Sequence, residues 1–258
     1  MTEMEKEQIM RTAKMFGNGA HIFVPKEWIG EQIIIIKPKK KSLKERVLEV
    51  LGPYLDSVIG AYLYGSYARD EQTGDSDIDL FVITNKKVKI KSEGFELVCL
   101  EEKDIKTALK IEPILIYSIL SESKPIINSK ILDELRSKFL PKLLDFQNYF
   151  KETEGMLKVS DDFLKSEKGE YLVSKAVVYS LVLRLRGLFI IKSILEGKKY
   201  SHKLFKSWIK SNLSKIDFDS IYEAYRCSKY EKKIRQKIKV SDIKLLIEFL
   251  KNEIAKIK

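Results

Sequence analysis

Two aspartates one residue apart, Asp77 and Asp79, follow a Gly-Ser pair at Gly65-Ser66. Alternation along a strand would place both carboxylates on one face, with Ile78 on the other. Adjacent carboxylates repel each other unless a cation lies between them, and hard oxygen ligands of this kind suit Mg²⁺. Glycine lets the backbone approach a phosphate closely, and the Ser66 hydroxyl and a following helix N-terminus can donate hydrogen bonds to anionic oxygens. The set therefore predicts a phosphate-binding turn beside a magnesium site.

The elements that must position these residues alternate between strands and helices along residues 41–138. β-Branched and aromatic runs predict strands at 58–64, 78–84 and 95–100. Apolar periodicity, with Ser42 as a cap, predicts helices at 42–56, 101–110 and 113–120. The Gly-Ser pair would then end the first strand and open a short helix, and the aspartate pair would begin the second strand. Both motifs would thus lie on adjacent strands.

This arrangement resembles the DNA polymerase β-like nucleotidyltransferase superfamily, and its local text is close to the minimal nucleotidyltransferases of prokaryotes. The resemblance implies two Mg²⁺ ions that hold an attacking oxygen and a triphosphate. It also implies a third carboxylate on a later strand, as metal ligand and general base. Glu96 takes that place, although the family more often has aspartate there, and the alternative is a solvent-facing strand glutamate. Arg69 would contact the triphosphate as a bidentate donor, or else be an exposed helix cation.

Residues 139–258 show only helical periodicity, and five apolar-periodic runs predict a bundle at 139–165, 168–196, 201–212, 217–227 and 241–257. The stretch 174–186 resembles helices of kanamycin-type nucleotidyltransferases and of HEPN proteins. Lys175, Arg184 and Arg186 could reach a nucleotide or acceptor, or could be structural members of ion pairs. HEPN ribonucleases carry an arginine a few residues before a histidine. Neither His21 nor His202 follows an arginine in that way, so ribonuclease activity is not expected.

Residues 1–40 read as a small β module with strands at 20–24 and 32–36. The string 17–30, which contains Val-Pro-Lys-Glu-Trp-Ile-Gly, resembles AbrB-like β modules. That resemblance implies DNA binding or dimerisation by strand exchange, and the alternative is a hairpin without DNA contact. A lone pair of strands is marginally stable in water, so the module is expected to dimerise or to pack on something else.

The chain has 258 residues, a formal net charge of +11 and a pI of about 9.3. Such a surface attracts nucleic acid and nucleotide phosphates, or is a lysine-rich solvated surface. Cys99 and Cys227 fit no zinc or redox spacing and suggest free thiols in a reducing compartment. The longest apolar stretch, 176–195, is interrupted by charged residues, so the expectation is a cytoplasmic protein without a membrane span.

Taken together, the patterns predict an α+β protein: a small β module at 1–40, a mixed-sheet nucleotidyltransferase core at 41–138 and a helical bundle at 139–258. The leading hypothesis is an Mg²⁺-dependent enzyme that transfers a nucleoside monophosphate, AMP from ATP foremost, to an acceptor hydroxyl. The acceptor could be a protein, a small molecule or RNA. The alternative is a DNA-binding or antitoxin-like regulator whose nucleotidyltransferase fold binds a nucleotide.

Overall fold

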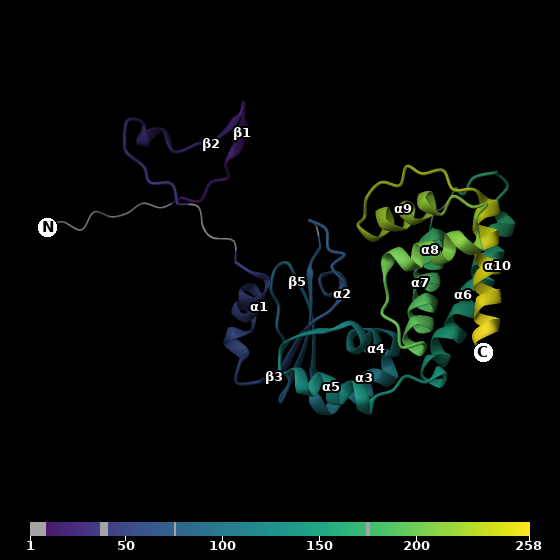
Figure 1. Cartoon of the computed structure of the whole chain (residues 1–258). Coiled ribbons are helices and arrows are strands. Elements are labelled where there is room, and N and C mark those ends of the chain that lie inside the picture. Colours follow the sequence, from purple (N-terminus) through teal and green to yellow (C-terminus); the bar gives the residue numbers. More distant parts are fainter. Residues whose placement is uncertain (1–8, 37–40, 75, 174–175) are drawn as a thin grey trace. The chain divides into compact units, whose positions relative to one another are not determined.

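The computed structural model describes residues 9–36, 41–74, 76–173 and 176–258. The chain divides at Ser42 into an N-terminal unit and a larger unit that runs from Leu43 to Lys258 (Figure 1). The larger unit contains a mixed four-stranded sheet and a helical region, so the predicted α+β class is confirmed. Among the described residues, no helix is both long enough and apolar enough to cross a bilayer.

The N-terminal unit contains a short antiparallel hairpin. Strand β1 (Lys14–Phe16) pairs with β2 (Gly19–His21), and the turn between them uses a positive φ of 54° at Gly17. A 3-10 turn, η1 (Lys26–Trp28), follows. The strand predicted at 20–24 is therefore present but ends early, and the one predicted at 32–36 is wrong. Residues 31–36 have no partner strand among the described residues, and an unpartnered strand would leave its backbone groups without hydrogen bonds.

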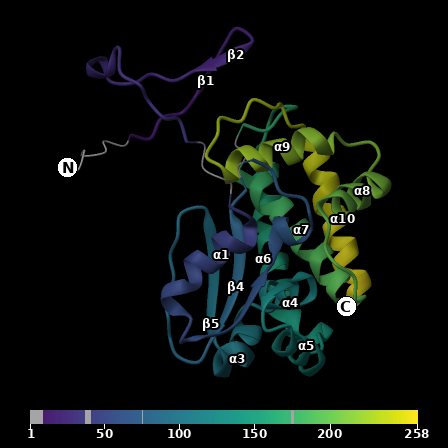
Figure 2. The same ribbon diagram turned by 60° about the vertical axis from the view of Figure 1, so that its left-hand side comes forward.

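The sheet of the larger unit has the strand order β5-β4-β3-β6. Its members are β3 (Val58–Leu63), β4 (Ile78–Thr84), β5 (Phe95–Glu101) and β6 (Lys124–Ile127). Strand β3 is antiparallel to β4 and β6. Strands β4 and β5 lie side by side (Figure 2) and are parallel. Their register places Asp79 opposite Glu96. The three strands predicted from the sequence are confirmed. Strand β6 was not predicted, because it is only four residues long and begins with Lys-Pro.

Strand alternation gives the sheet two apolar faces. One face, with Leu80 and Val82, packs against α1 (Leu43–Leu51) through Val47 and Leu51. The other face carries Phe81 and is covered by the helices α3 (Ile105–Ile111), α4 (Pro113–Glu122) and α5 (Ser129–Lys138). Because Asp79 is two residues from Phe81, the same pleat directs its carboxylate towards the face that α4 covers. Three 3-10 turns complete this part: η2 (Gly52–Tyr54), η3 (Glu102–Asp104) and η4 (Leu143–Phe146).

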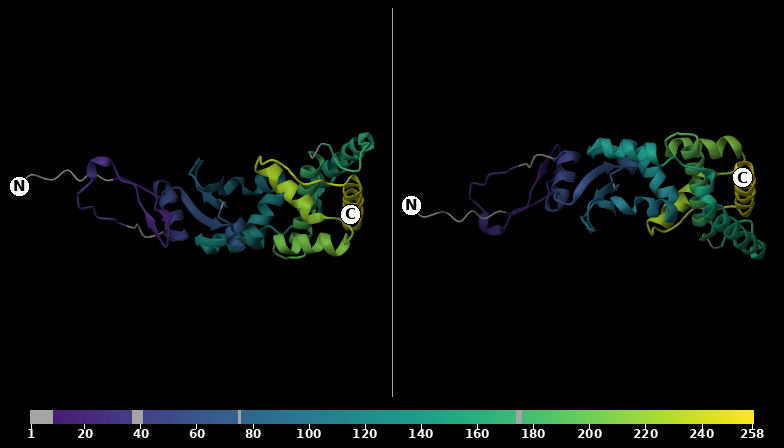
Figure 3. Two further views of the ribbon diagram at one scale, coloured as in Figure 1. Left: turned by 90° about the horizontal axis from the view of Figure 1, so that it is seen from above. Right: turned by 90° about the horizontal axis from the view of Figure 1, so that it is seen from below.

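Five helices form the rest of the larger unit: α6 (Gln147–Ser166), α7 (Ala176–Leu195), α8 (His202–Asn212), α9 (Phe218–Lys229) and α10 (Val240–Ile257). They lie on one side of the sheet, away from α1 (Figures 1 and 3). A single buried cluster runs from Phe81 on the sheet through Phe146 and Val178 to Leu250 on α10. The sheet and the helices therefore share one hydrophobic core, and the predicted domain boundary at 138 stays a prediction.

Candidate active site

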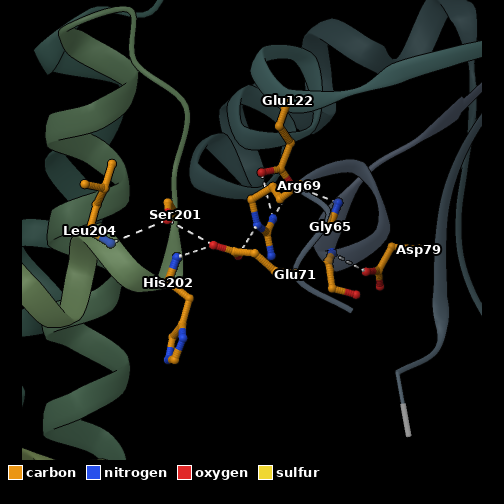
Figure 4. A network of polar contacts seen from close by, with 9 residues as sticks. Gly65, Arg69, Glu71, Asp79, Glu122, Ser201, His202 and Leu204 are labelled. Carbon is orange, nitrogen blue, oxygen red and sulfur yellow. Dashed lines mark hydrogen bonds and ion pairs between the residues drawn. The ribbon is translucent and has the colours of Figure 1, made fainter. Parts of the chain in front are cut away.

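A sharp turn follows β3 and opens the one-turn helix α2 (Gly65–Ala68). Gly65 has a φ of +68°, and a Cβ there would lie 1.8 Å from Oδ2 of Asp79, so only glycine fits. The backbone N–H of Gly65 donates to Oε1 of Glu122 over 2.9 Å, and that of Ser66 donates to Oδ2 of Asp79 over 3.3 Å (Figure 4). The turn is thus held between two carboxylates, and the Ser66 side chain lies at the cavity described next.

The three predicted carboxylates, Asp77, Asp79 and Glu96, are among the acidic residues that line one cavity of about 780 Å³, together with Gly65 and Ser66. Asp79 and Glu96 are direct neighbours across the parallel strands β4 and β5, so their side chains share a face. Asp77 precedes β4 by one residue and lines the same cavity. Burial and then the charge of Glu96 raise the pKa of Asp79 to about 6, against the hydrogen bond from Ser66. Burial and the charge of Glu96 thus disfavour the ionised form of Asp79 at this point of the cavity.

The donor chemistry of these three residues fits Mg²⁺, which prefers carboxylate oxygens. The repulsion between Asp79 and Glu96 is the kind that a bound divalent cation relieves. The carboxylate oxygens of the three residues do not converge on one point. Within the described residues, no three His, Cys, Asp or Glu side chains form a group that could hold a metal ion. Coordination would therefore require side-chain movement within the cavity, and the predicted roles of Asp77, Asp79 and Glu96 stay predictions.

Arg69, on the turn after α2, lies in a buried ion-pair network. Its Nη1 donates to both carboxylate oxygens of Glu122, at 2.8 and 2.7 Å, and its Nε donates to Glu71 at 3.0 Å. The Arg69 side chain is 15% exposed and that of Glu122 is 5% exposed, so the alternative of an exposed helix cation is wrong. Arg69 also lines the cavity, and its contact with a triphosphate stays a prediction.

Glu71 connects this network to the helical region. Its Oε1 accepts hydrogen bonds from the Ser201 hydroxyl at 2.9 Å and from the backbone N–H of His202 at 3.0 Å (Figure 4). Ser201 is also the N-cap of α8, because its hydroxyl accepts from the backbone N–H of Leu204. Burial alone would raise the pKa of Glu71, but the bonds from Arg69 and Ser201 outweigh it and lower that pKa. The residues after Arg69 are thereby fixed to the start of α8.

Arg186, on α7, lines the same cavity. Its guanidinium and that of Arg69 each lie 5.2 Å from the centre of the Tyr200 ring. Its Nε is buried without a hydrogen-bond partner, and Arg186 forms no ion pair with any residue that the structure describes. Arg184, by contrast, pairs with Glu152 at 3.3 Å. Lys175 lies outside the described residues. The Arg186 side chain has hydrogen bonds with Tyr200 and Tyr225, but neutral hydroxyls do not cancel its charge, so Arg186 is a candidate contact for an anion.

The sequence placed six residues in this site, and all of them line the one cavity: Gly65, Ser66, Arg69, Asp77, Asp79 and Glu96. It missed Glu71, Glu122 and Tyr200. Glu122 had one signal, since it is the only charged residue of the apolar helix Pro113–Glu122 and a charge on such a helix needs a partner. No sequence pattern indicated Glu71 or Tyr200, because their roles depend on contacts between segments that are distant in sequence.

Residues 45–132 match the family model described as Polymerase beta, Nucleotidyltransferase. The matched segment contains the Gly65-Ser66 turn, the three carboxylates and Glu122. The chain therefore carries a nucleotidyltransferase domain, the class that the sequence predicted.

Two solved structures are similar to the chain. A nucleotidyltransferase-like protein from Exiguobacterium sibiricum 255-15 is 14% identical, with a TM-score of 0.36, and the match covers 83% of this chain and 75% of that one. Spectinomycin adenyltransferase AAD(9) from Enterococcus faecialis, solved with ATP and spectinomycin, is 15% identical, with a TM-score of 0.45 and coverage of 81% and 97%. At these scores neither likeness carries an argument about substrate. A comparison with curated proteins found no match.

Proposed function

We propose that the protein is an Mg²⁺-dependent nucleotidyltransferase that transfers a nucleoside monophosphate from a nucleoside triphosphate to an acceptor hydroxyl. The observation that carries this proposal is the cavity wall formed by Asp77, Asp79 and Glu96 beside the Gly65-Ser66 turn. Carboxylates on adjacent strands and a phosphate-binding turn are the two halves of a site for a metal-bound triphosphate. ATP is the donor that we test first.

In this proposal, the residues of the chain bind and orient both substrates. The Ser66 hydroxyl and Arg186 hold the phosphates, and Arg186 gains the counter-ion that it otherwise lacks. The Glu96 carboxylate accepts the proton of the acceptor hydroxyl. Mg²⁺, held by Asp77, Asp79 and Glu96, would supply charge neutralisation for the triphosphate. Most of the rate enhancement then comes from positioning and electrostatic stabilisation.

The direct test measures ATP binding by calorimetry with Mg²⁺ and transfer from α-labelled ATP. We expect the wild type to bind ATP only with a divalent cation, and the double variant Asp77→Asn, Asp79→Asn to lose cation-dependent binding and label transfer. The matched control is Asp56→Asn, Asp104→Asn, which changes the same charge at exposed positions outside the cavity. Equal labelling of an acceptor by the wild type and the Asp77, Asp79 variant would show the proposal to be wrong.

The N-terminal unit supports a further part of the proposal, which is self-association. None of the described residues 9–36 is buried, and apolar side chains such as Phe16 and Ile34 are 72% and 90% exposed. Apolar surface of this kind is covered in stable proteins, and the AbrB-like resemblance suggests a second copy as the cover. The charge of this unit gives DNA binding less support. Residues 9–36 contain three basic and two acidic residues, namely Arg11, Lys14, Lys26, Glu27 and Glu31.

Sedimentation velocity of the full chain tests this part. We expect a dimer for the wild type and a monomer for Phe16→Ser, Ile34→Ser. The control is Val159→Ser on α6, which removes an exposed apolar side chain from the larger unit and should leave the dimer intact. A wild-type monomer would contradict self-association, and a gel shift with duplex DNA at low salt would instead favour the DNA-binding alternative. The HEPN-like resemblance of the helical region stays a prediction.

A further inference from the structure

A second cavity, of about 660 Å³, opens beside the first and is lined by four exposed lysines: Lys106, Lys110, Lys138 and Lys142. Lys106 and Lys110 lie one turn apart on α3 and so share a face. Lys138 ends α5, and Lys142 precedes η4. The two cavities have Lys110, Asp145 and Asn148 in common, so they form one continuous surface. We refer to the part lined by the four lysines as the lysine groove.

The positive charge of the lysine groove is not neutralised by the described residues. None of the four lysines forms an ion pair with any of them. Asp145 is the one acidic residue in the described lining of the groove. Its Oδ2 accepts from the Tyr117 hydroxyl at 2.9 Å and from the backbone N–H of Lys142 at 2.8 Å, so it is engaged in local structure. The groove thus offers four cations to an anionic ligand.

The position of the groove separates it from the triphosphate site. Helix α4 lines the first cavity, with its last residue, Glu122, bonded to the Gly65 turn and its first residue, Pro113, next to Lys110 in the lining. The ten residues of this helix correspond to a length of about 15 Å. The four lysines line a cavity that adjoins the first at Lys110, near the start of α4, whereas the Gly65 turn is bonded to the end of this helix. They are placed for a second anionic ligand that reaches the carboxylates along the cavity.

We infer that the acceptor is the end of a single-stranded RNA, with its terminal 3′-hydroxyl at Glu96 and its preceding phosphates over the lysine groove. This inference rests on the proposed function. A small acceptor bound at the carboxylates would not need four further cations in an adjoining cavity, whereas a polynucleotide carries a negative charge on every residue. Leu140 and Leu144, which are 66% and 69% exposed in the same lining, offer apolar contacts to unstacked bases. RNA offers unpaired ends that such a groove can admit.

The transfer step is a substitution at phosphorus. The 3′-hydroxyl oxygen forms a bond to the α-phosphorus of ATP, and the bond from that phosphorus to the oxygen that bridges to the β-phosphorus breaks. Pyrophosphate leaves with the electron pair, and the hydroxyl proton passes to the Glu96 carboxylate. The product is an RNA one nucleotide longer, and no group is oxidised or reduced.

The binding experiment uses a 5′-labelled single-stranded RNA oligonucleotide and fluorescence anisotropy with the full chain. We expect affinity to fall steeply with salt. The charge-reversal variants Lys106→Glu, Lys110→Glu and Lys138→Glu, Lys142→Glu should each weaken binding by about tenfold or more. The control Lys86→Glu, Lys87→Glu makes the same charge change at exposed positions outside both cavities and should bind as the wild type. Thermal unfolding of all three variants should be measured to check that each of them is folded. Equal weakening by the control would overturn the lysine groove as the binding surface.

The transfer experiment adds ATP and Mg²⁺ to the same RNA, to the same sequence as single-stranded DNA, and to an RNA with a 3′-deoxy end. We expect extension of the first RNA alone and loss of extension in both groove variants. ATP binding in calorimetry should be unchanged in Lys138→Glu, Lys142→Glu, because neither residue lines the first cavity. Label on protein side chains, or extension of DNA without RNA, would overturn the RNA acceptor. If ATP binds and RNA is neither bound nor extended, this inference fails and the proposed function stands. If ATP does not bind, the proposed function fails.

Discussion

The charged residues around the cavity fall into two groups that differ in their partners. Arg69 forms ion pairs with Glu71 and Glu122. These two glutamates also accept hydrogen bonds from the Gly65 turn and from the start of α8. Asp79 and Glu96 repel each other, and Arg186 has hydrogen bonds with Tyr200 and Tyr225 but no ion pair among the described residues. The first group is paired by opposite charges, whereas the charges of the second group are open to a ligand. Substitutions should therefore separate the two groups, with stability lost in one and binding lost in the other.

The largest effect is expected from Glu122→Leu, because it leaves the buried Arg69 guanidinium without its main counter-ion. Breaking a buried pair from one side costs about 3–5 kcal/mol, so thermal unfolding should shift down by roughly 6 °C or more. The double variant Arg69→Met, Glu122→Leu removes both charges and should recover part of this loss. A double variant less stable than the single one would show that the pair is not what Glu122 contributes.

Arg186→Met should affect binding instead. Loss of a charged hydrogen-bond donor to phosphate costs about 1.5–3 kcal/mol, which corresponds to a rise of roughly ten- to a hundred-fold in the Kd for ATP. The unfolding temperature should change little, because the loss of hydrogen bonds with Tyr200 and Tyr225 is offset by removal of a buried charge that has no ion pair among the described residues. Calorimetry and thermal unfolding measure the two effects. Arg184→Met, which removes a partly exposed pair with Glu152, serves as the control and should leave ATP binding unchanged.

Asp79→Asn should make the protein more stable without metal ions, although it abolishes transfer. The pKa of Asp79 in the folded chain is about 6, above its ordinary value of 3.8. Ionisation of this acid therefore opposes folding, with no penalty below about pH 4 and the full penalty above about pH 6. Two pKa units would be about 3 kcal/mol, and partial exposure reduces this to about 1 kcal/mol. We expect the variant to melt about 2–4 °C higher than the wild type near pH 7. An equal gain near pH 4 would contradict the electrostatic cause.

The smallest effect is expected from Ser201→Ala, which removes the N-cap of α8 and one of the bonds to Glu71. Loss of a cap costs about 1 kcal/mol. The unfolding temperature should therefore fall by a few degrees while the Kd for ATP is kept, as expected of the paired group. Ser211→Ala removes an exposed hydroxyl that donates only to its own helix and is the matched control. A large rise in the Kd for ATP would show that Ser201 contributes to ligand binding, as Asp79, Glu96 and Arg186 are expected to do.

The carboxylate side of this comparison could be predicted from the sequence, and the paired network could not. Asp77 and Asp79 are local in sequence, so strand alternation alone gives their common face. Glu96 required only that β5 lie beside β4, which the resemblance implied. Glu71 and Glu122 instead depend on a contact with Arg69, and residues far apart in the chain meet only through tertiary packing. Local patterns carry no information about such pairs.

In the N-terminal unit, a strong local pattern predicted a strand that the described residues do not form. Four consecutive isoleucines, Ile33–Ile36, have high strand propensity. They form no strand in the single chain, since a strand also needs a neighbour with free backbone groups. The hairpin that forms instead pairs Gly19–His21, which overlaps the strand predicted at 20–24, with Lys14–Phe16, where the sequence predicted no strand.

The core that the sheet and the helices share also bears on the timing of ligand exchange. Because one buried cluster includes both Phe81 and Leu250, the helical region cannot swing away from the sheet without exposing apolar surface to water. Under the proposed function, ATP would then enter and leave through the mouth of the cavity while the chain keeps its fold. In stopped-flow mixing we expect a single phase whose rate increases in proportion to ATP concentration, without the plateau that a slow hinge movement would impose.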